Sequence, residues 1–223
     1  GESRTERSGN KTVGIEEGTD VWLISLNDRG DELWQKSYNF KNRDILMGMN
    51  VINTGDGKNS KGVLLVHAAG NDGVNLDENP NFPTNEYSFQ SKPLDMYLCV
   101  GASTRDKKNL AAPFSNFSSR QVNIFAPGFE IYNTVPQSDY KTLQGTSMAA
   151  PMVSGVAALL KSYFPTLSMK EIKDIMLASA KQYKGTMIPS PGTANSVDFG
   201  TLSTSGGVID VSAAVKMCQA KVK

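Results

Sequence analysis

Beyond position 60, apolar residues gather in short continuous runs bounded by glycine or polar residues. The longest run spans 61–70, and two shorter ones follow at 98–102 and 123–126. Continuous runs of this kind are typical of strands that are buried on both faces, as in a parallel sheet. We therefore expect these segments to form strands of a largely parallel sheet.

The pattern becomes helical from Ser147 to Phe164, where apolar residues occur nearly all round the helix. Such a helix is expected to be central and buried, and Pro165 ends it. Residues 168–171 form a capping box that opens a second, amphipathic helix. Residues 208–217 predict a short strand followed by a closing helix. Strands that alternate with helices predict an α/β fold, a three-layer and mostly parallel twisted sheet flanked by helices.

The first 60 residues differ in pattern. Residues 1–18 are polar and without period, which favours a flexible lead-in. Residues 21–26 and 32–38 read as two strands around a tight turn, an N-terminal β-hairpin. The short run 50–53 is a further strand candidate. The predicted division is a lead-in, a hairpin segment of uncertain origin and an α/β domain, at 1–18, 19–60 and 61–223.

Composition narrows the class of protein. Hydrophobic residues make up 39% of the chain and charged residues 20%, which is typical of a globular protein. No apolar run approaches the roughly 18 to 20 residues of a membrane span. The net charge of +1 gives no electrostatic reason to expect a nucleic-acid partner.

Cys99 and Cys218 lie far apart, and we expect both to be unpaired. The chain begins with Gly1 rather than Met, so we expect a processed or trimmed piece.

Ser147 is the first candidate for chemistry. It opens the long helix, after a glycine and before small residues that allow close packing. Pro151 in the first turn lacks only an N–H that would be unpaired there. The free N–H groups of a helix N-terminus then point at whatever the serine attacks. Taken alone, the segment fits equally well a simple N-cap serine on a tightly packed helix.

The whole heptad 145–151, Gly-Thr-Ser-Met-Ala-Ala-Pro, resembles the nucleophile motif of subtilisin-like serine proteases. The segment 68–73, Ala-Ala-Gly-Asn-Asp-Gly, resembles the family's segment that carries the oxyanion-hole asparagine. Further segments match in the family's order, at 82–84, 100–103, 114–118, 125–128, 170–173 and 207–210. The resemblance covers about residues 61 to 220.

The resemblance implies a peptide-bond hydrolase with Ser147 as nucleophile and Asn71 in the oxyanion hole. Taken alone, Asn71 before Asp-Gly would also fit a turn residue. The resemblance further implies that Gly70, Gly145 and Thr146 bind substrate. It implies polypeptide substrates and a secreted or cell-envelope location, but no cofactor. No carboxylate cluster has the spacing of a calcium loop, so we predict no metal site.

Two departures from the family stand out. Its catalytic histidine and aspartate lie in His-Gly-Thr-His and Asp-Ser/Thr-Gly types of motif, and neither string occurs in this sequence. The one histidine, His67, lies on a predicted buried strand about 13 Å before Asn71, at ~3.3 Å per residue. The family does not use that position for catalysis. We therefore interpret His67 as a core or strand-end residue, and the chain as inactive by itself.

The second departure concerns substrate binding. Residues 51–57 could be a degenerate copy of the strand that walls the family's S1 pocket. Only residues 58–61 then separate it from the next strand, too few for a crossover helix between parallel strands. Either that helix is lost or the first 60 residues are not the family's N-terminal half, and we favour the second interpretation.

Three interpretations follow. The chain is part of an active protease whose other half lies elsewhere, a pseudoenzyme that binds or scaffolds extracellular peptides, or a truncated product without selected function. A truncated sheet leaves an exposed edge where strands belonged. We therefore expect homo-oligomers formed through that edge or through the hairpin.

Overall fold

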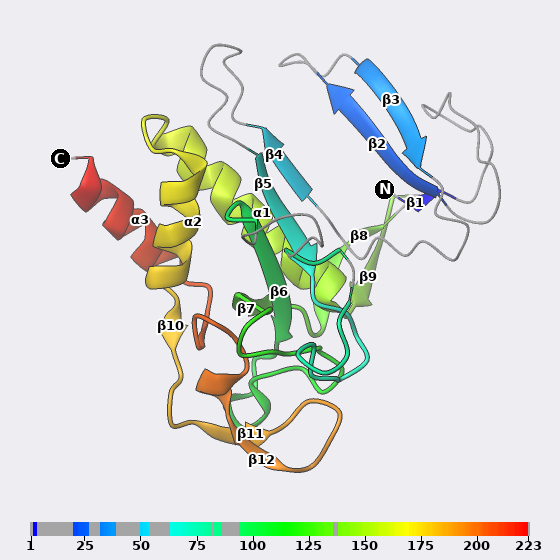
Figure 1. Cartoon of the computed structure of the whole chain (residues 1–223), viewed down its shortest axis with the longest axis vertical. Helices are drawn as coiled ribbons and strands as arrows, with labels where there is room; N and C mark the ends of the chain where they lie inside the picture. Colours follow the sequence, from blue (N-terminus) through cyan, green and yellow to red (C-terminus); the bar gives the residue numbers. More distant parts are fainter. Residues whose placement is uncertain are drawn as a thin grey trace. The chain divides into compact units, whose positions relative to one another are not determined.

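The structure of the protein is a computed structural model. It describes the complete residues 64–81, 83–85, 94–135 and 138–222, and the backbone alone of residues 2–3, 20–26, 32–38, 50–53 and 63. The chain divides into two compact units, residues 1–46 and 47–223, and each is described by itself (Figure 1).

The first unit contains a three-stranded antiparallel sheet in the order β1-β2-β3. Its strands are β1 (Glu2–Ser3), β2 (Asp20–Leu26) and β3 (Glu32–Tyr38). β2 and β3 form the predicted hairpin, with Val21 opposite Tyr38 and a register shift at Ser25 and Leu26. Two residues of the predicted lead-in form β1, and the rest of it lies outside the described residues.

The second unit is built on a six-stranded sheet in the order β10-β13-β7-β6-β5-β4. The strands are β4 (Asn50–Asn53), β5 (Val63–Ala68), β6 (Tyr97–Ser103), β7 (Ile124–Pro127), β10 (Lys181–Gln182) and β13 (Gly207–Val208). The four inner strands run parallel to one another, and each edge strand is antiparallel to its neighbour. The predicted α/β class with a mostly parallel sheet is confirmed.

β4 differs from the parallel strand that the sequence allowed. It pairs antiparallel with β5, with Asn53 opposite Val63 and Asn50 opposite Val66. Antiparallel neighbours need no crossover helix, which explains how so short a connection joins the two strands. Interpreting β4 as a copy of a parallel strand is therefore wrong.

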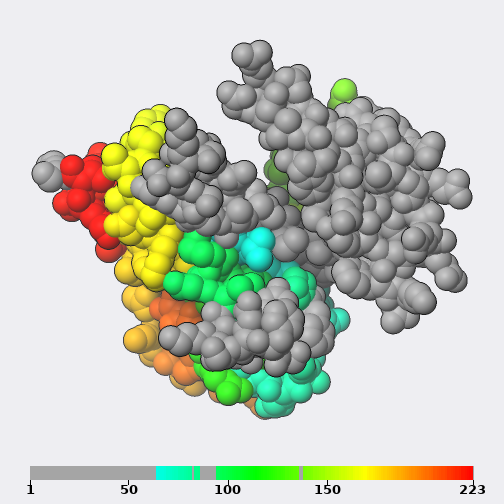
Figure 2. Space-filling view, turned by 45° about the horizontal axis from the view of Figure 1, so that its top comes forward, coloured from blue at the N-terminus to red at the C-terminus, as the bar shows by residue number. Residues whose placement is uncertain are grey.

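The long helices are α1 (Thr146–Tyr163), α2 (Met169–Ala178) and α3 (Val211–Lys221). They pack with one face of the sheet around a shared core that includes Val66, Val100 and Val153. In Figure 2, α2 in yellow and α3 in red lie side by side, in agreement with their contacts. α1 is less buried than predicted, because only one side of it meets the sheet, and Met152 and Leu159 are exposed.

The capping box of α2 forms as predicted. The Ser168 hydroxyl accepts a hydrogen bond from the Glu171 backbone N–H, and the Ser168 backbone N–H donates to the Glu171 carboxylate at 2.8 Å. Hydrogen bonds from Ser168 lower the pKa of Glu171 to about 2, with a smaller contribution from Lys221. The start of α2 is thus fixed by its local sequence.

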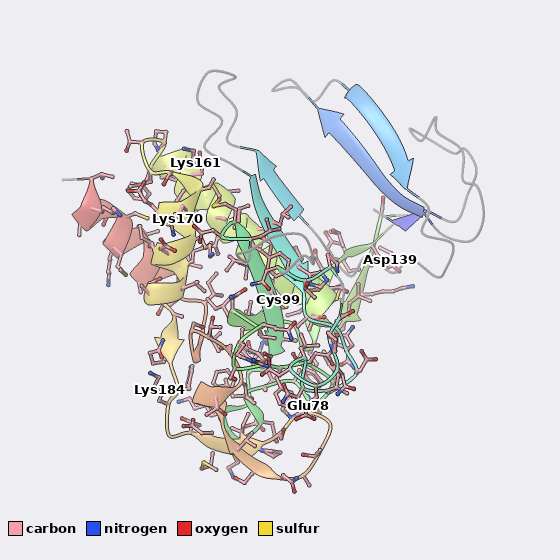
Figure 3. All side chains as sticks on the ribbon, viewed as in Figure 1. Glu78, Cys99, Asp139, Lys161, Lys170 and Lys184 are labelled. Atoms are coloured by element: carbon pink, nitrogen blue, oxygen red, sulfur yellow. The ribbon has the colours of Figure 1, made fainter. Side chains whose placement is uncertain are left out.

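The opposite face of the sheet is covered by loops, the short helix η2 (Phe199–Thr201) and the pair β11 (Met187–Pro189) and β12 (Ser196–Asp198). Phe125 and Phe199 are central to this second core, with ring centroids 5.0 Å apart. Cys99 belongs to it, on β6 in the interior (Figure 3), whereas Cys218 lies in the helical core. Both cysteines are buried and free, as predicted.

The remaining elements are the short helix η1 (Lys107–Asn109) and a two-stranded hairpin of β8 (Ile131–Val135) and β9 (Asp139–Leu143). β9 leads directly to α1. No helix among the described residues is apolar over a length that could cross a bilayer.

Candidate active site

The predicted site residues around Asn71 and Ser147 lie at one edge of the sheet, where the parallel strands end. β5 and β6 point to the same edge in Figure 1, and α1 begins beside it. Gly128, directly after β7, donates its N–H to Ser103 O at the end of β6. Its carbonyl accepts a hydrogen bond of 2.8 Å from Gly145 N, just before α1. These bonds bring two strand ends and one helix start together, the usual position of a site in such a sheet.

The turn that follows β5 is held by Asn116, whose side chain is 1% exposed. Its Oδ1 accepts hydrogen bonds from the backbone N–H groups of Asp72 and Val74, at 3.0 and 3.1 Å. Its Nδ2 donates to Ala69 O at 2.9 Å. A second amide, Asn81 Nδ2, donates to the same carbonyl at 3.2 Å. Two distant side chains thus replace the backbone partners that a sharp turn lacks.

Asn71 lies in that turn and contacts the start of α1. Its Oδ1 accepts hydrogen bonds from Thr146 N at 2.9 Å and from Thr146 Oγ1 at 3.0 Å. The Thr146 hydroxyl oxygen in turn accepts from Gly70 N at 3.1 Å. Because the Asn71 oxygen is held in this way, the orientation of its amide is fixed, and Nδ2 is the end of the amide turned away from Thr146.

Gly145 lies between Asn71 Nδ2 and the backbone N–H of Ser147. A Cβ placed on Gly145 would lie 3.4 Å from Asn71 Nδ2 and 3.7 Å from Ser147 N. Both nitrogen donors therefore border one small space that glycine leaves open. Gly145 has a φ of 148°, a value that L side chains rarely adopt, so the open space and the backbone conformation both require glycine.

The structure also shows where the neighbouring predicted residues lie. Thr146 is fully buried, and its hydroxyl contacts Gly70 and Asn71. Gly70 has a φ of 101°, and a Cβ there would lie 2.4 Å from Asn116 Nδ2. Ser147, by contrast, is only half-buried at the start of α1. The structure thus brings the five predicted site residues together at the start of α1.

His67 lies away from this group. The alternating residues Leu64, Val66 and Ala68 of β5 face the helical core, so His67 faces the opposite side of the sheet. It is 2% exposed, and burial lowers its pKa from 6.5 to about 4, which keeps the imidazole neutral. The interpretation of His67 as a core residue is confirmed.

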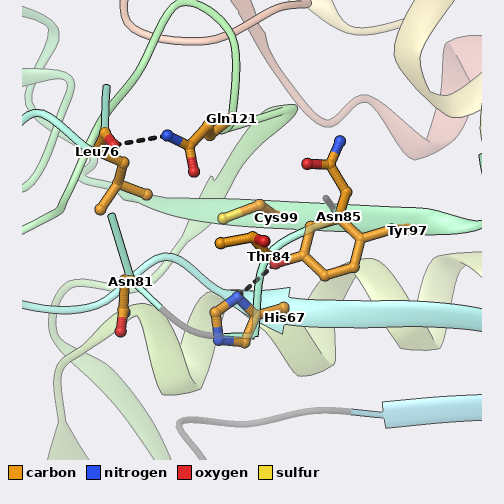
Figure 4. A pocket seen from close by; sticks show the side chains of 8 residues that line it. All are labelled: His67, Leu76, Asn81, Thr84, Asn85, Tyr97, Cys99 and Gln121. Atoms are coloured by element: carbon orange, nitrogen blue, oxygen red, sulfur yellow. Dashed lines mark hydrogen bonds between the residues drawn. The ribbon is translucent and has the colours of Figure 1, made fainter. Parts of the chain in front are cut away.

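The contacts of His67 assign its tautomer. Tyr97 Oη donates to Pro83 O at 2.7 Å, so it accepts from His67 Nδ1, 2.8 Å away. Figure 4 shows this pair beside Cys99 and Asn81, around a cavity of about 10 Å³. That is room for about one water molecule. Burial also raises the pKa of the Cys99 thiol to about 12, so this cavity contains no ready nucleophile.

Two residues that shape the site were not assigned a role from the sequence. Asn116 belongs to a segment that matched the family, and Asn81 directly precedes another. Their types indicate only polar loop residues. Their function as partners of the turn after β5 depends on contacts with residues 47 and 12 positions away. Among the residues that the structure describes, no group of three or more His, Cys, Asp or Glu side chains could hold a metal ion.

Comparison with known proteins agrees with this arrangement. The sequence matches the Subtilase family over residues 3–203, a range that includes the predicted hairpin segment. Subtilisin DY of Bacillus licheniformis is 32% identical over 136 residues, which is 61% of this chain and 46% of that protein. The extracellular basic protease of Dichelobacter nodosus is 34% identical over 165 residues, 69% of this chain and 23% of that protein.

Solved structures give the same result. The subtilase cytotoxin SubAB matches with a TM-score of 0.56 and 28% identity, over 71% of this chain and 49% of that one. The prenylagaramide maturation protease PagA matches with a TM-score of 0.51 and 30% identity, over 70% and 50%. The chain spans less than half the length of the curated relatives it matches. On this evidence the chain belongs to the subtilase family of serine proteases.

Proposed function

We propose that this chain contains the nucleophile and the oxyanion hole of a serine endopeptidase site. Ser147 is the nucleophile, and its attack on an amide carbonyl places negative charge on the carbonyl oxygen. Asn71 Nδ2 and the Ser147 backbone N–H stabilise that charge. Gly145 leaves the space in which the charged oxygen lies.

The observation that supports this proposal most directly is the fixed orientation of Asn71. Both hydrogen bonds from Thr146 go to the Asn71 oxygen, at 2.9 and 3.0 Å. The nitrogen is therefore oriented before any substrate binds, which is the condition for strong stabilisation of a developing charge. A turn asparagine without a chemical role has no need of a buried threonine to fix one end of its amide.

We further propose that these 223 residues do not turn over peptide bonds by themselves. A serine hydroxyl needs a base to remove its proton, and histidine is the usual one. The one histidine of the sequence, His67, faces the side of the sheet opposite α1 and is hydrogen-bonded to Tyr97. An oxyanion hole with substrate binding alone leaves roughly 10³- to 10⁴-fold acceleration over the uncatalysed rate.

Labelling with a fluorophosphonate probe tests both parts, because the probe reacts with activated serines. The experiment compares this chain with Ser147→Ala and with the exposed control Ser119→Ala. We expect no labelling of any of the three proteins. Labelling that disappears only in Ser147→Ala would confirm the nucleophile and overturn the inactivity, since a base would then reach Ser147.

The proposal that Ser147 and Asn71 form a nucleophile and an oxyanion hole has its own test. Addition of a separate polypeptide that carries the family's histidine and aspartate motifs should restore labelling at Ser147 and not in Ser147→Ala. Asn71→Ala should then lower turnover of a peptide substrate by about 10² to 10³. Full restored turnover in Asn71→Ala would contradict the oxyanion role. Peptide binding without any restored labelling would instead favour a pseudoprotease that binds peptides.

A further inference from the structure

A groove of about 310 Å³ lies at the same edge of the sheet as Ser147, between the loop after β6 and the turn after β7. Its apolar surface comes from Pro113 and Phe129, and its rim contains Arg105, Asp106 and Glu130. The volume lies at the lower end of the range for ligand sites in proteins. The candidate oxyanion hole does not use any of these residues.

One wall of the groove is the loop after β6, and hydrogen bonds among its own residues, 104–110, hold it in place. Thr104 Oγ1 donates to Asn109 O at 2.7 Å, and Thr104 N donates to Leu110 O at 2.9 Å. The Asp106 carboxylate accepts hydrogen bonds from Lys108 N at 2.9 Å and from Asn109 Nδ2 at 2.7 Å. A ligand therefore meets a preformed surface and does not have to order this loop.

The other wall is attached to the nucleophile segment. Gly128 O accepts a hydrogen bond from Gly145 N, and Gly145 lies two positions before Ser147. Phe129 and Glu130 directly follow Gly128, so this wall is held close to the segment that carries Ser147. Phe129 stacks on Phe114 with ring centroids 6.2 Å apart. Glu130 has a φ of 54°, a conformation that strains a non-glycine residue and that clusters at functional sites.

Two of the three charged side chains on the rim are available to a ligand. Asp106 already accepts two hydrogen bonds within its own loop. Arg105 and Glu130 are exposed, and neither takes part in an ion pair with another described residue. The three charged side chains sum to one negative charge. An apolar surface with such a rim is complementary to an apolar side chain that has a basic neighbour.

We propose that this groove binds an extended polypeptide segment, with an apolar side chain on Phe129 and Pro113 and a basic residue beside Glu130. The proposal rests on the proposed function only in that the ligand is a polypeptide. Because Gly128 is hydrogen-bonded to Gly145, the wall of the groove that contains Phe129 and Glu130 is attached to the segment that precedes Ser147. The groove thereby adds a sequence preference that is independent of the nucleophile.

Nuclear magnetic resonance titration of the ¹⁵N-labelled full chain tests the proposal. The probes are the capped hexapeptide Gly-Ala-Leu-Lys-Ala-Gly, the same peptide with Glu in place of Lys, and the same peptide with Ala in place of Leu. We expect shifts at 104–109 and 129–130, with dissociation constants of about 1 mM or below. The Lys peptide should bind about two- to fivefold more tightly than the Glu peptide, and the Ala peptide about tenfold more weakly.

Variants assign the preference to Glu130. Glu130→Lys keeps a non-glycine residue at the strained position and should reverse the preference between the Lys and Glu peptides. Glu130→Gln should remove most of it. Lys107→Glu, a charge change in the same loop at a residue that does not line the groove, should leave the preference in place.

Three results would overturn the proposal: no shifts at 104–109 and 129–130 with a well-dispersed spectrum, shifts confined to other residues, or an unchanged charge preference in Glu130→Lys. The titration involves no chemical step, so it gives the same answer in Ser147→Ala. A negative titration therefore leaves the labelling experiment unaffected, and absent labelling leaves the titration valid.

Discussion

Asn71 and His67 lie four positions apart on one stretch of chain, and their surroundings differ in every respect that matters for chemistry. Asn71 follows the carboxyl end of β5, half-buried, with its oxygen held by Thr146 at the start of α1. His67 lies within β5, 2% exposed, on the face of the sheet opposite α1, with Tyr97 as its partner. Histidine is by type the better catalyst, yet here the asparagine is the residue that lies beside the start of α1 and Ser147.

The difference shows that position in the fold outweighs residue type. A strand places successive side chains on opposite faces, so a residue inside it meets the core of one face or the other. The turn after a parallel strand instead opens toward the edge where other strands end. Changes that disturb the turn, the buried histidine or the link to α1 should therefore have separable effects.

The largest effect is expected at the turn. Gly70→Ala adds a Cβ that lies 2.4 Å from Asn116 Nδ2 and forces a non-glycine residue to a φ of 101°. Overlap with a buried amide and backbone strain together should lower the free energy of unfolding by about 4 kcal/mol. Urea-induced unfolding followed by circular dichroism measures the change.

Gly155→Ala is the matched control. Gly155 lies inside α1 with nothing within 4 Å of a Cβ placed on it. Alanine is the better helix former, so the control should raise the free energy of unfolding by about 0.5 to 1 kcal/mol. Similar stability of the two variants would contradict the tight packing of Asn116 against Gly70.

The next effect concerns His67 and pH. Its pKa is about 4 in the folded protein and 6.5 as the ordinary value, so between these values the unfolded chain binds the proton more strongly. The free energy of unfolding should therefore fall as the pH drops from about 6.5 to about 4, by about 3 kcal/mol in total. His67→Gln should lose this part of the decrease when urea unfolding is compared at about pH 7 and about pH 4.

The comparison between the two proteins isolates the histidine. The carboxyl groups with lowered pKa, such as Glu171 and Asp106, also lose stabilisation as the pH falls below their ordinary values. They contribute equally to the natural protein and to His67→Gln, so they cancel in the difference. Parallel stability curves for the two proteins would show that His67 is not buried in its neutral form.

The smallest effect is expected at the link between the turn and α1. Thr146→Val keeps the shape of the side chain and removes the hydroxyl that joins Gly70 N to Asn71 Oδ1. The loss should lower the free energy of unfolding by about 1 to 2 kcal/mol and shift the Asn71 side-chain amide signals in nuclear magnetic resonance spectra. The exposed Thr142→Val should change stability by less than about 0.5 kcal/mol. Unchanged Asn71 signals would mean that the Thr146 hydroxyl does not orient the amide and that the Thr146 backbone N–H is sufficient.

The predictions from sequence succeeded where local rules apply. The apolar runs at 61–70, 98–102 and 123–126 gave three parallel strands, because a strand buried on both faces must be apolar throughout. The capping box fixed the start of α2, because both of its partners lie within four residues. Oligomerisation through the sheet edge or through the hairpin, and the three-part division of the chain, stay predictions.

The sequence by itself determined that this chain has an α/β fold and the Ser147 and Asn71 motifs of its family, since these depend on periodicity and on short contiguous strings. Only the tertiary structure decided which end of the Asn71 amide faces the open space, and that Asn116 and Asn81 hold its turn. It also decided that β4 runs antiparallel and that His67 faces away from Ser147. The physical reason is that hydrogen bonds between segments far apart in the chain, and the face on which a strand residue lies, depend on how the elements pack.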